Sequence, residues 1–416
     1  MKGIVQTTFI AAAFFLPFNL KAQELQNFEI VGRYFYGDSA GGPITGVCSD
    51  DSYLYLTENY DSLKIYAITE SNLPSNLMGS CWAFEVDHLF QRGDYVIGTG
   101  IYTWHGFTLF DISDISAPAP IGHYGGSFVI AHPILRENLL YAAFWQDIAD
   151  QRGLTIFDIT DPDSVFLTDY YRTDQILPFD IDLYGDFAYV SDWIGNHPCE
   201  IFDVSDPYDI IEIGEMRLLA PGAVEVYGRH IFVGPSVDLD TGPIGIFSLE
   251  NPAAPVLDLA LNTCIFNSWS IEIVNGYAFI FDGLRAKILV MDIGGFQYPE
   301  SLGVFVGFPN CCISQIAVNN DFIYYAAGDS GLYVLRYTGP MPINTGDANN
   351  SGAVNGIDVV YMVNYLRSPE PPPLPDPPER GDANGDCVVN GLDVVYLVNY
   401  LKGYGEKPIR AFCYGR

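Results

Sequence analysis

The chain has 416 residues, of which 49% are apolar, and it carries a formal net charge of −32 at neutral pH. This length exceeds one ordinary domain, so we expect a large repeat domain with a smaller module beside it. The negative charge would be repelled by nucleic acid and by anionic membranes, which argues against both as partners and favours the binding of cations.

The first 22 residues have the pattern of a secretory signal peptide. Lys2 supplies a positive charge, residues 9–16 form an apolar core, and Ala22 is the small residue expected at a cleavage point. An uncleaved anchor is the alternative, but this core reaches only about half of the ~20 residues that a membrane span needs. We therefore expect a secreted, extracellular protein that is associated with the cell surface and not inserted in a membrane. Its eight cysteines, an even number, suit disulfide formation there.

One short sequence motif recurs seven times between residues 63 and 337. It is an apolar strand that ends in an acidic or polar residue and continues with Ile or Val, Ser or Thr, and often Asp-Pro. Successive copies lie 44 to 47 residues apart, measured between Ala67, Asp111, Asp158, Asp203, Ser248, Asp292 and Arg336. A period in the mid-forties with several short strands per unit predicts an all-β, seven-bladed β-propeller with one four-stranded blade per copy.

A surplus strand indicates how the ring closes. The seventh unit stops after its third strand, and an unpaired strand at 28–34 precedes the first unit. We expect this strand to complete the last blade, because its addition removes two exposed sheet edges. The propeller would then span residues 23–338. The join at 339–345 is short, so we expect the propeller and the C-terminal module (346–416) to lie in contact.

Three carboxylates take the same position on the innermost strands of consecutive units: Asp182, Glu225 and Glu272. Such strands line the central channel of a propeller, so these side chains are candidates to hold a cation or a hydroxylated ligand. The alternative is a solvated channel lining without a ligand. The equivalent positions of two other units hold Cys48 and Ala317, so the ring of carboxylates is incomplete.

The seven units resemble the LVIVD-repeat family of propellers. The resemblance rests on LTIFDITDP at 154–162, EIFDVSDP at 200–207 and GDSGLYVL at 328–335, and it covers residues 28–338. It implies the fold and a secreted or surface location, without an activity. Residues 37–41 (GDSAG) fit the serine-nucleophile elbow, but a strand follows where that elbow needs a helix. With no catalytic constellation recognisable, we expect a protein that is not an enzyme.

Two twelve-residue stretches near the C-terminus, 347–358 and 382–393, carry oxygen-bearing side chains at positions 1, 3, 5, 9 and 12. Ca²⁺ requires about six to eight oxygen ligands, which such loops supply together with the backbone carbonyl at position 7. The sequence therefore predicts two calcium ions. Their ligands would be Asp347, Asn349, Ser351, Ala353, Asn355 and Asp358 in loop 1, and Asp382, Asn384, Asp386, Val388, Asn390 and Asp393 in loop 2.

The two loops differ at positions 5 and 6. Ser351 leaves loop 1 with two carboxylates, whereas Asp386 gives loop 2 three, so we expect loop 2 to bind calcium more tightly.

Cys387 stands where the turn ordinarily needs glycine for a positive φ. A disulfide to Cys413 would hold that turn; a free, buried Cys387 is the alternative. For the remaining cysteines we choose no pairing, because six thiols allow fifteen arrangements: Cys48, Cys81, Cys199, Cys264, Cys311 and Cys312.

Each calcium loop leads into nearly the same helix, VVYMVNYL at 359–366 and VVYLVNYL at 394–401. A duplicated loop and helix with Asp at position 12 resembles a type I dockerin more than a full EF-hand, over residues 346–416, and a proline-rich insert at 367–380 separates the copies. The resemblance implies an α-helical module that docks to a cohesin-like or other surface protein. The helices would present Val360, Tyr361, Tyr365, Val395, Tyr396 and Tyr400 to it.

Three functions follow from these patterns. The first is calcium-dependent attachment, with the propeller as the displayed cargo. The second is self-assembly into fibres or a surface layer, in which the module binds the propeller of a neighbouring copy, because a non-closing heterologous contact propagates. The third, supported only by the association of dockerins with polysaccharide, is a polysaccharide-associated hydrolase. Carbohydrate is a further candidate ligand.

Overall fold

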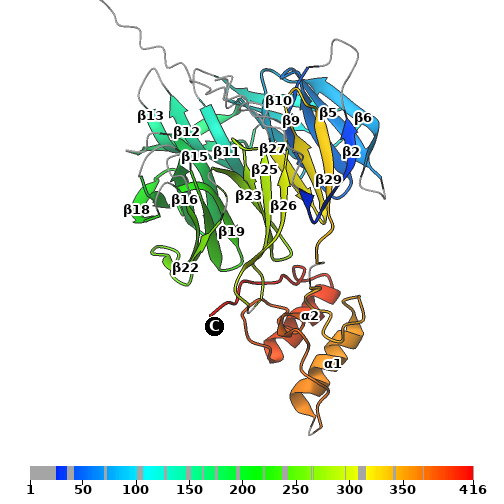
Figure 1. Cartoon of the computed structure of the whole chain (residues 1–416). Helices are drawn as coiled ribbons and strands as arrows, with labels where there is room; N and C mark the ends of the chain where they lie inside the picture. Colours follow the sequence, from blue (N-terminus) through cyan, green and yellow to red (C-terminus); the bar gives the residue numbers. More distant parts are fainter. Residues whose placement is uncertain are drawn as a thin grey trace, which may run out of the picture.

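The computed structural model describes residues 25–34, 42–69, 73–100, 106–125, 129–146, 151–161, 164–173, 177–193, 197–218, 221–236, 242–263, 265, 267–295, 297–307, 315–340, 343–368 and 370–415. The expected signal peptide (1–22) lies outside these residues, as do 37–41, Cys264, Cys311 and Cys312. Within the described residues the strands form seven sheets, and a module with two α-helices lies beneath them (Figure 1). The seven-bladed β-propeller with a small helical module, predicted from the sequence, is confirmed.

The first four blades follow one another along the chain, each with four antiparallel strands in sequence order. Blade 1 consists of β3 (Ile44–Ser49), β4 (Tyr53–Glu58), β5 (Ser62–Ile68) and β6 (Pro74–Trp82). Blade 2 consists of β7 (His88–Arg92), β8 (Tyr95–Thr99), β9 (Phe107–Asp111) and β10 (Ala119–Tyr124). Blade 3 consists of β11 (Val129–Arg136), β12 (Leu139–Gln146), β13 (Gln151–Asp158) and β14 (Phe166–Arg172). Blade 4 consists of β15 (Pro178–Tyr184), β16 (Phe187–Asp192), β17 (Cys199–Asp203) and β18 (Ile211–Met216).

The last three blades include the strands that close the ring. Blade 5 consists of β19 (Pro221–Tyr227), β20 (His230–Pro235), β21 (Pro243–Ser248) and β22 (Val256–Asn262). Blade 6 consists of β23 (Ser268–Val274), β24 (Tyr277–Asp282), β25 (Lys287–Asp292), β26 (Glu300–Val306) and, as a fifth strand, β1 (Leu25–Gln26). Blade 7 consists of β27 (Gln315–Asn319), β28 (Phe322–Ala326), β29 (Leu332–Tyr337) and β2 (Phe28–Tyr34), which pairs antiparallel with β29. The N-terminal segment therefore joins the last two blades.

The repeated sequence motif lies at the end of the third strand of each blade. Where it contains an aspartate, that side chain closes the turn that follows. A side-chain oxygen of Asp111 accepts a hydrogen bond from the backbone N–H of Ser113 at 2.8 Å, and Asp203 accepts one from Ser205 at 2.9 Å. Asp favours this turn because its short side chain reaches the backbone two residues later. Hydrogen bonds from the serine also lower the pKa of Asp111 and of Asp203. These repeated aspartates therefore have a structural role.

Apolar side chains between adjacent sheets hold the blades together. The middle strands of a blade are almost fully buried, as in β16 and β17, whereas the outermost strand β18 is largely exposed. Between blades 2 and 3, Phe107 meets Phe157 edge to face, with ring centroids 5.2 Å apart. Burial of each such side chain contributes about 1.5–3 kcal/mol. The packed blades fix the seven innermost strands around the channel.

The helical module is small and is built around two matched helices, α1 (Gly356–Arg367) and α2 (Gly391–Leu401), with a short 3₁₀ turn, η2 (Pro378–Arg380), between them. Asn355 and Asp358 form a capping box at the start of α1, and Asn390 and Asp393 repeat it on α2. Four fully buried side chains make up the module's core: Ala348, Met362, Ala383 and Leu397. Neither helix is long and apolar enough to cross a bilayer, and no other described helix is.

The C-terminal tail (408–413) connects the module to the underside of blades 5 and 6 (Figure 1). The backbone N–H of Gly295 donates to the carbonyl of Ala411 at 2.7 Å, and the N–H of Cys413 donates to the carbonyl of Gly295 at 2.9 Å. Phe412 is buried against His230, with ring centroids 4.9 Å apart. Arg410 pairs with Asp292 of β25 at 2.5 Å. The module therefore packs against the propeller through a defined contact.

Candidate calcium loops and the central channel

The two calcium loops make the same hydrogen bonds. At position 1, Asp347 accepts from the backbone N–H groups of residues 351 and 352, both at 2.8 Å, and Asp382 accepts from those of 386 and 387 at 3.1 and 3.0 Å. At position 12, Asp358 accepts from residues 349 and 355, and Asp393 accepts from 384 and 390. The first and last carboxylates of each loop are thus drawn towards the loop centre.

The donor set in these loops fits calcium. Asp347, Asp358 and Asp393 are completely buried, and burial of a carboxylate without a cation is costly. The side-chain oxygen of Asn349, at position 3, is buried and has no hydrogen-bond partner among the described residues. Burial raises the pKa of Asp382 to about 6, and the nearby charges of Asp393 and Asp386 act in the same direction. Carboxylate, amide and carbonyl oxygens are the ligands that Ca²⁺ prefers.

The disulfide expected between Cys387 and Cys413 is formed, with the two Cα atoms 5.5 Å apart. Cys387 has a φ of +67°, in the region that favours glycine, so the bond joins a strained position of loop 2 to the tail. A carboxylate oxygen of Asp382 and the sulfur atoms of the two cysteines lie within 4.8 Å of one another. Because the two sulfurs are bonded to each other, this group is not a thiolate metal site. Cys48, Cys81 and Cys199 are free.

Arg380 distinguishes loop 1 from loop 2. Its guanidinium lies 3.3 Å from a carboxylate oxygen of Asp347 and is mostly buried, so a fixed positive charge stands at position 1 of loop 1. No ion pair with the Asp382 carboxylate occurs within the described part of loop 2. A cation that enters loop 1 must therefore compete with the guanidinium for Asp347.

We expect Asp382→Ala to remove the tighter of two calcium sites and Asp347→Ala the weaker, by calorimetric titration of the full chain. Loop 2 offers three carboxylates and no competing guanidinium. We therefore expect its dissociation constant for calcium to be at least about tenfold lower than that of loop 1. Arg380→Gln should tighten the weaker site, because it removes the competing charge. Equal losses in both aspartate variants, or an Arg380→Gln variant without effect, would contradict this order.

The expected partner-facing residues fall into two groups. Val360 and Val395 are both 57% exposed, whereas the four tyrosines at 361, 365, 396 and 400 are half-buried. The hydroxyl of Tyr361 donates to the carbonyl of Pro373 at 2.8 Å, so this side chain holds the proline-rich insert against α1. The valines therefore offer more surface to a partner than the tyrosines do.

Two exposed apolar residues were not identified from the sequence. Ile357 is 66% exposed and Leu392 is 61% exposed, each one turn before the exposed valine of its helix. Residues three apart are neighbours on a helix, so Ile357 and Val360 lie on one face of α1. Leu392 and Val395 lie on one face of α2 in the same way. A helical projection with the core positions Met362 and Leu397 on the opposite side would have revealed both. The module thus carries two matching apolar faces, one on each helix.

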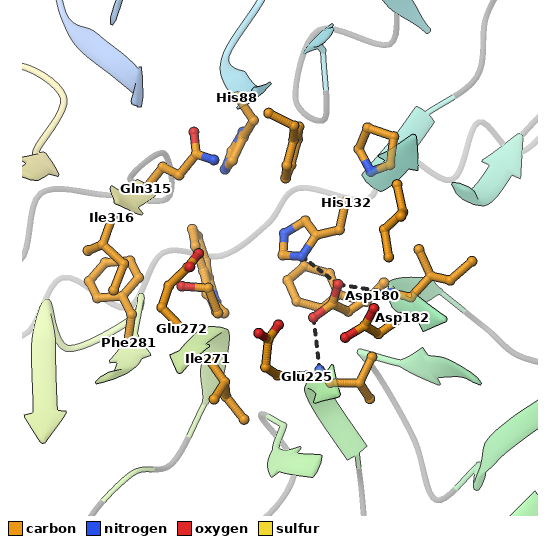
Figure 2. A pocket seen from close by; sticks show the side chains of 18 residues that line it. His88, His132, Asp180, Asp182, Glu225, Ile271, Glu272, Phe281, Gln315 and Ile316 are labelled. Carbon is orange, nitrogen blue, oxygen red and sulfur yellow. Dashed lines mark hydrogen bonds and ion pairs between the residues drawn. The ribbon is translucent and has the colours of Figure 1, made fainter. Parts of the chain in front are cut away.

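The central channel holds the three carboxylates at one level of the ring. Asp182, Glu225 and Glu272 each lie opposite the central aromatic residue of the second strand, paired with Tyr189, Phe232 and Phe279. Together with Asp180 and His132 they surround a cavity of about 170 Å³ that the innermost strands of blades 2 to 7 line (Figure 2). Cys48 and Ala317 lie at the same level of blades 1 and 7 and are buried.

Two of the channel carboxylates are tied to neighbouring blades. Asp180 accepts from the backbone N–H of Val224 at 2.8 Å and pairs with Nδ1 of His132 at 2.7 Å, so it connects blades 3, 4 and 5. Asp182 accepts from the N–H of Val226 at 2.5 Å. Both therefore hold blade 4 to blade 5. Asp180 and His132 were not among the residues expected from the sequence.

Two family models match the chain. Residues 345–402 match the dockerin type I domain, and residues 136–173 and 179–217 match the LVIVD repeat. No curated protein has a matching sequence.

Similar solved structures share the fold at low identity. The Cps50 (Swd1) propeller of Myceliophteria thermophila has a TM-score of 0.53 and 13% identity, over 74% of this chain and 99% of that chain. The designed protein Ika8 has a TM-score of 0.50 and 10% identity, over 73% and 100%. A proposed 6-phosphogluconolactonase of Bacteroides uniformis has a TM-score of 0.50 and 13% identity, over 64% and 86%. Such identities show the fold alone. The chain is a seven-bladed β-propeller with LVIVD repeats that carries a C-terminal dockerin type I domain.

Proposed function

We propose that this protein is secreted and attaches its propeller, in a calcium-dependent manner, to a cohesin-like domain. The observation that carries the proposal is the pair of apolar faces on α1 and α2, which stay exposed although the module packs against the propeller. Each face begins in the first helical turn after a calcium loop. Calcium in the loops would therefore set the position of both faces.

The family matches support a binding role over a catalytic one. A dockerin type I domain is a docking module, and it matches residues 345–402. The likeness to a proposed 6-phosphogluconolactonase concerns the fold alone, because the two chains share 13% identity. The propeller is then the cargo that the module places at a surface.

Docking is expected to require both calcium and the exposed valines. The double variant Val360→Asp, Val395→Asp should bind immobilised type I cohesin domains about 100-fold more weakly than the wild type, because two central apolar contacts become charged. Surface plasmon resonance with calcium and with chelator would measure this loss. Tyr404→Asp, at a fully exposed site beyond α2, is the matched control and should bind normally.

Two outcomes would contradict the attachment proposal. The first is cohesin binding that survives the chelator or the double valine change. The second is filaments or defined oligomers formed by the purified protein in calcium without a partner, which would support self-assembly through the neighbouring propeller. Sedimentation velocity and negative-stain images distinguish this second case.

A further inference from the structure

The lining of the channel cavity combines acidic and apolar side chains. One position of the innermost strand carries a carboxylate in blades 4, 5 and 6. The same position holds Phe90 in blade 2 and Ile134 in blade 3. Aromatic rings of Phe90, Phe179, Trp269 and Phe281 line the same cavity. A ligand that fits here therefore needs both a positive charge and an apolar body.

Glu225 and Glu272 are held less firmly than the two aspartates of the channel. Asp180 and Asp182 are satisfied by backbone N–H groups, but neither glutamate forms a hydrogen bond or an ion pair with any residue that the structure describes. Figure 2 shows their carboxylates directed into the space that His132 and Asp182 also face. The two half-buried carboxylates repel each other, so a cation that pairs with both would relieve that repulsion.

The lining of the cavity argues for a ligand larger than one metal ion. Four aromatic rings line it beside the carboxylates, and a bare metal ion, which prefers oxygen ligands, would make no use of them. By volume, about 150 Å³ is enough for a molecule of the size of benzene, so about 170 Å³ admits a short carbon chain.

We propose that the channel binds a small organic ammonium ion, whose charged group pairs with Glu225 and Glu272 and whose carbon chain packs against the aromatic rings of the cavity. An ammonium group has three donors, which suits two carboxylates on adjacent blades. Aromatic rings add a favourable cation–π contribution at short range. This ligand site belongs to the propeller and does not depend on docking through the module.

The test is calorimetric titration of the full chain in saturating calcium with n-butylamine, which is an ammonium ion at neutral pH. The amine should bind the wild type, and Glu225→Gln and Glu272→Gln should each weaken binding about tenfold or more, because each removes one charged hydrogen-bond acceptor. The neutral analogue 1-butanol should bind far more weakly. Glu29→Gln, at an exposed glutamate of β2, is the matched control and should leave the affinity unchanged.

Thermal unfolding of the variants shows whether a loss of binding comes from a folding defect. Without ligand, the two glutamine variants should be as stable as the wild type or more stable, since each removes the repulsion between the two carboxylates. The proposal is overturned if n-butylamine does not bind, if 1-butanol binds as tightly, or if both variants retain the affinity. It is also overturned if calcium titration shows one ion more in the wild type than in the double glutamine variant, which would make the channel a metal site.

The pH dependence of this binding has a definite sign. Burial, with the charges of neighbouring carboxylates, raises the pKa of Asp182 and of Glu272 to about 7 and that of Glu225 well above its usual range. An ammonium ion favours the ionised carboxylates, so its affinity should rise between about pH 6 and about pH 8, with release of protons. The charged groups nearby are His88, His132, Arg92, Asp87 and Asp180. An affinity that does not change with pH would contradict pairing with these glutamates.

Discussion

Removal of calcium by a chelator is expected to unfold residues 346–413 and to leave the propeller folded. The module has only four fully buried core side chains, and a core of this size rarely supplies enough stability by itself. It also buries the first and last carboxylates of both loops, which repel one another when no cation is present. Binding at a thousand times the dissociation constant would add about 4 kcal/mol per site, enough to decide whether the module folds.

Differential scanning calorimetry and hydrogen exchange would measure this effect. The chelated protein should lose the transition of the module and the amide protection of α1 and α2, while the propeller transition changes little. The double variant Asp358→Asn, Asp393→Asn should behave in the same way even in calcium. Equal protection of both helices with and without calcium would refute the expectation, and with it the proposed calcium-dependent attachment.

The blades could be predicted from the sequence because each copy of the repeat is one supersecondary unit. In every blade but the last the four repeat strands follow one another along the chain, and in four of the seven copies an aspartate closes a local turn. The period of the repeat therefore gives the number of blades. The calcium loops could be predicted equally well, since the expected ligands of each loop lie within twelve consecutive residues. In both cases the information is local.

The channel was only partly predictable. Asp180 lies where the register of β15 shifts between Pro178 and Ile181, so the alternation of the strand did not indicate it. His132 takes the equivalent place in blade 3. It lies at a bulge, where the register of β11 shifts between Ala131 and Ile134, and it has a φ of +43°. A bulge redirects a side chain away from the position that simple alternation indicates.

The contact between the tail and the propeller was not predictable, because it depends on isolated residues. Phe412 and Arg410 belong to no periodic pattern, and their partners lie more than 100 residues away in the sequence. Only the short join between the domains suggested that they touch. Long-range contacts of this kind are specified by shape and charge after both parts have folded.

Phe412→Ala is expected to release the tail from the propeller without unfolding either domain. Phe412 is buried between His230, Phe232 and the apolar core of blades 5 and 6, and removal of a buried phenylalanine ring costs about 3–5 kcal/mol. The remaining contacts include two backbone hydrogen bonds with Gly295, a hydrogen bond from the Tyr227 hydroxyl to the carbonyl of Arg410, and the ion pair of Arg410 with Asp292. A hydrogen bond contributes about 0.5–1.5 kcal/mol, less than the buried ring, so we do not expect these contacts to hold the tail in place alone.

Hydrogen exchange would show the release as lost protection at residues 408–413 and at Gly295, and small-angle scattering would show a wider range of domain orientations. Tyr404→Ala, at an exposed aromatic residue of the same module, should change neither measurement. Because the disulfide joins Cys413 to loop 2, the freed tail should also loosen Cys387 and weaken calcium binding at that loop more than at loop 1. If Phe412→Ala keeps full protection at Gly295, the tail does not anchor the module, and the propeller would have no mechanical connection to calcium loop 2 through this strand of the chain.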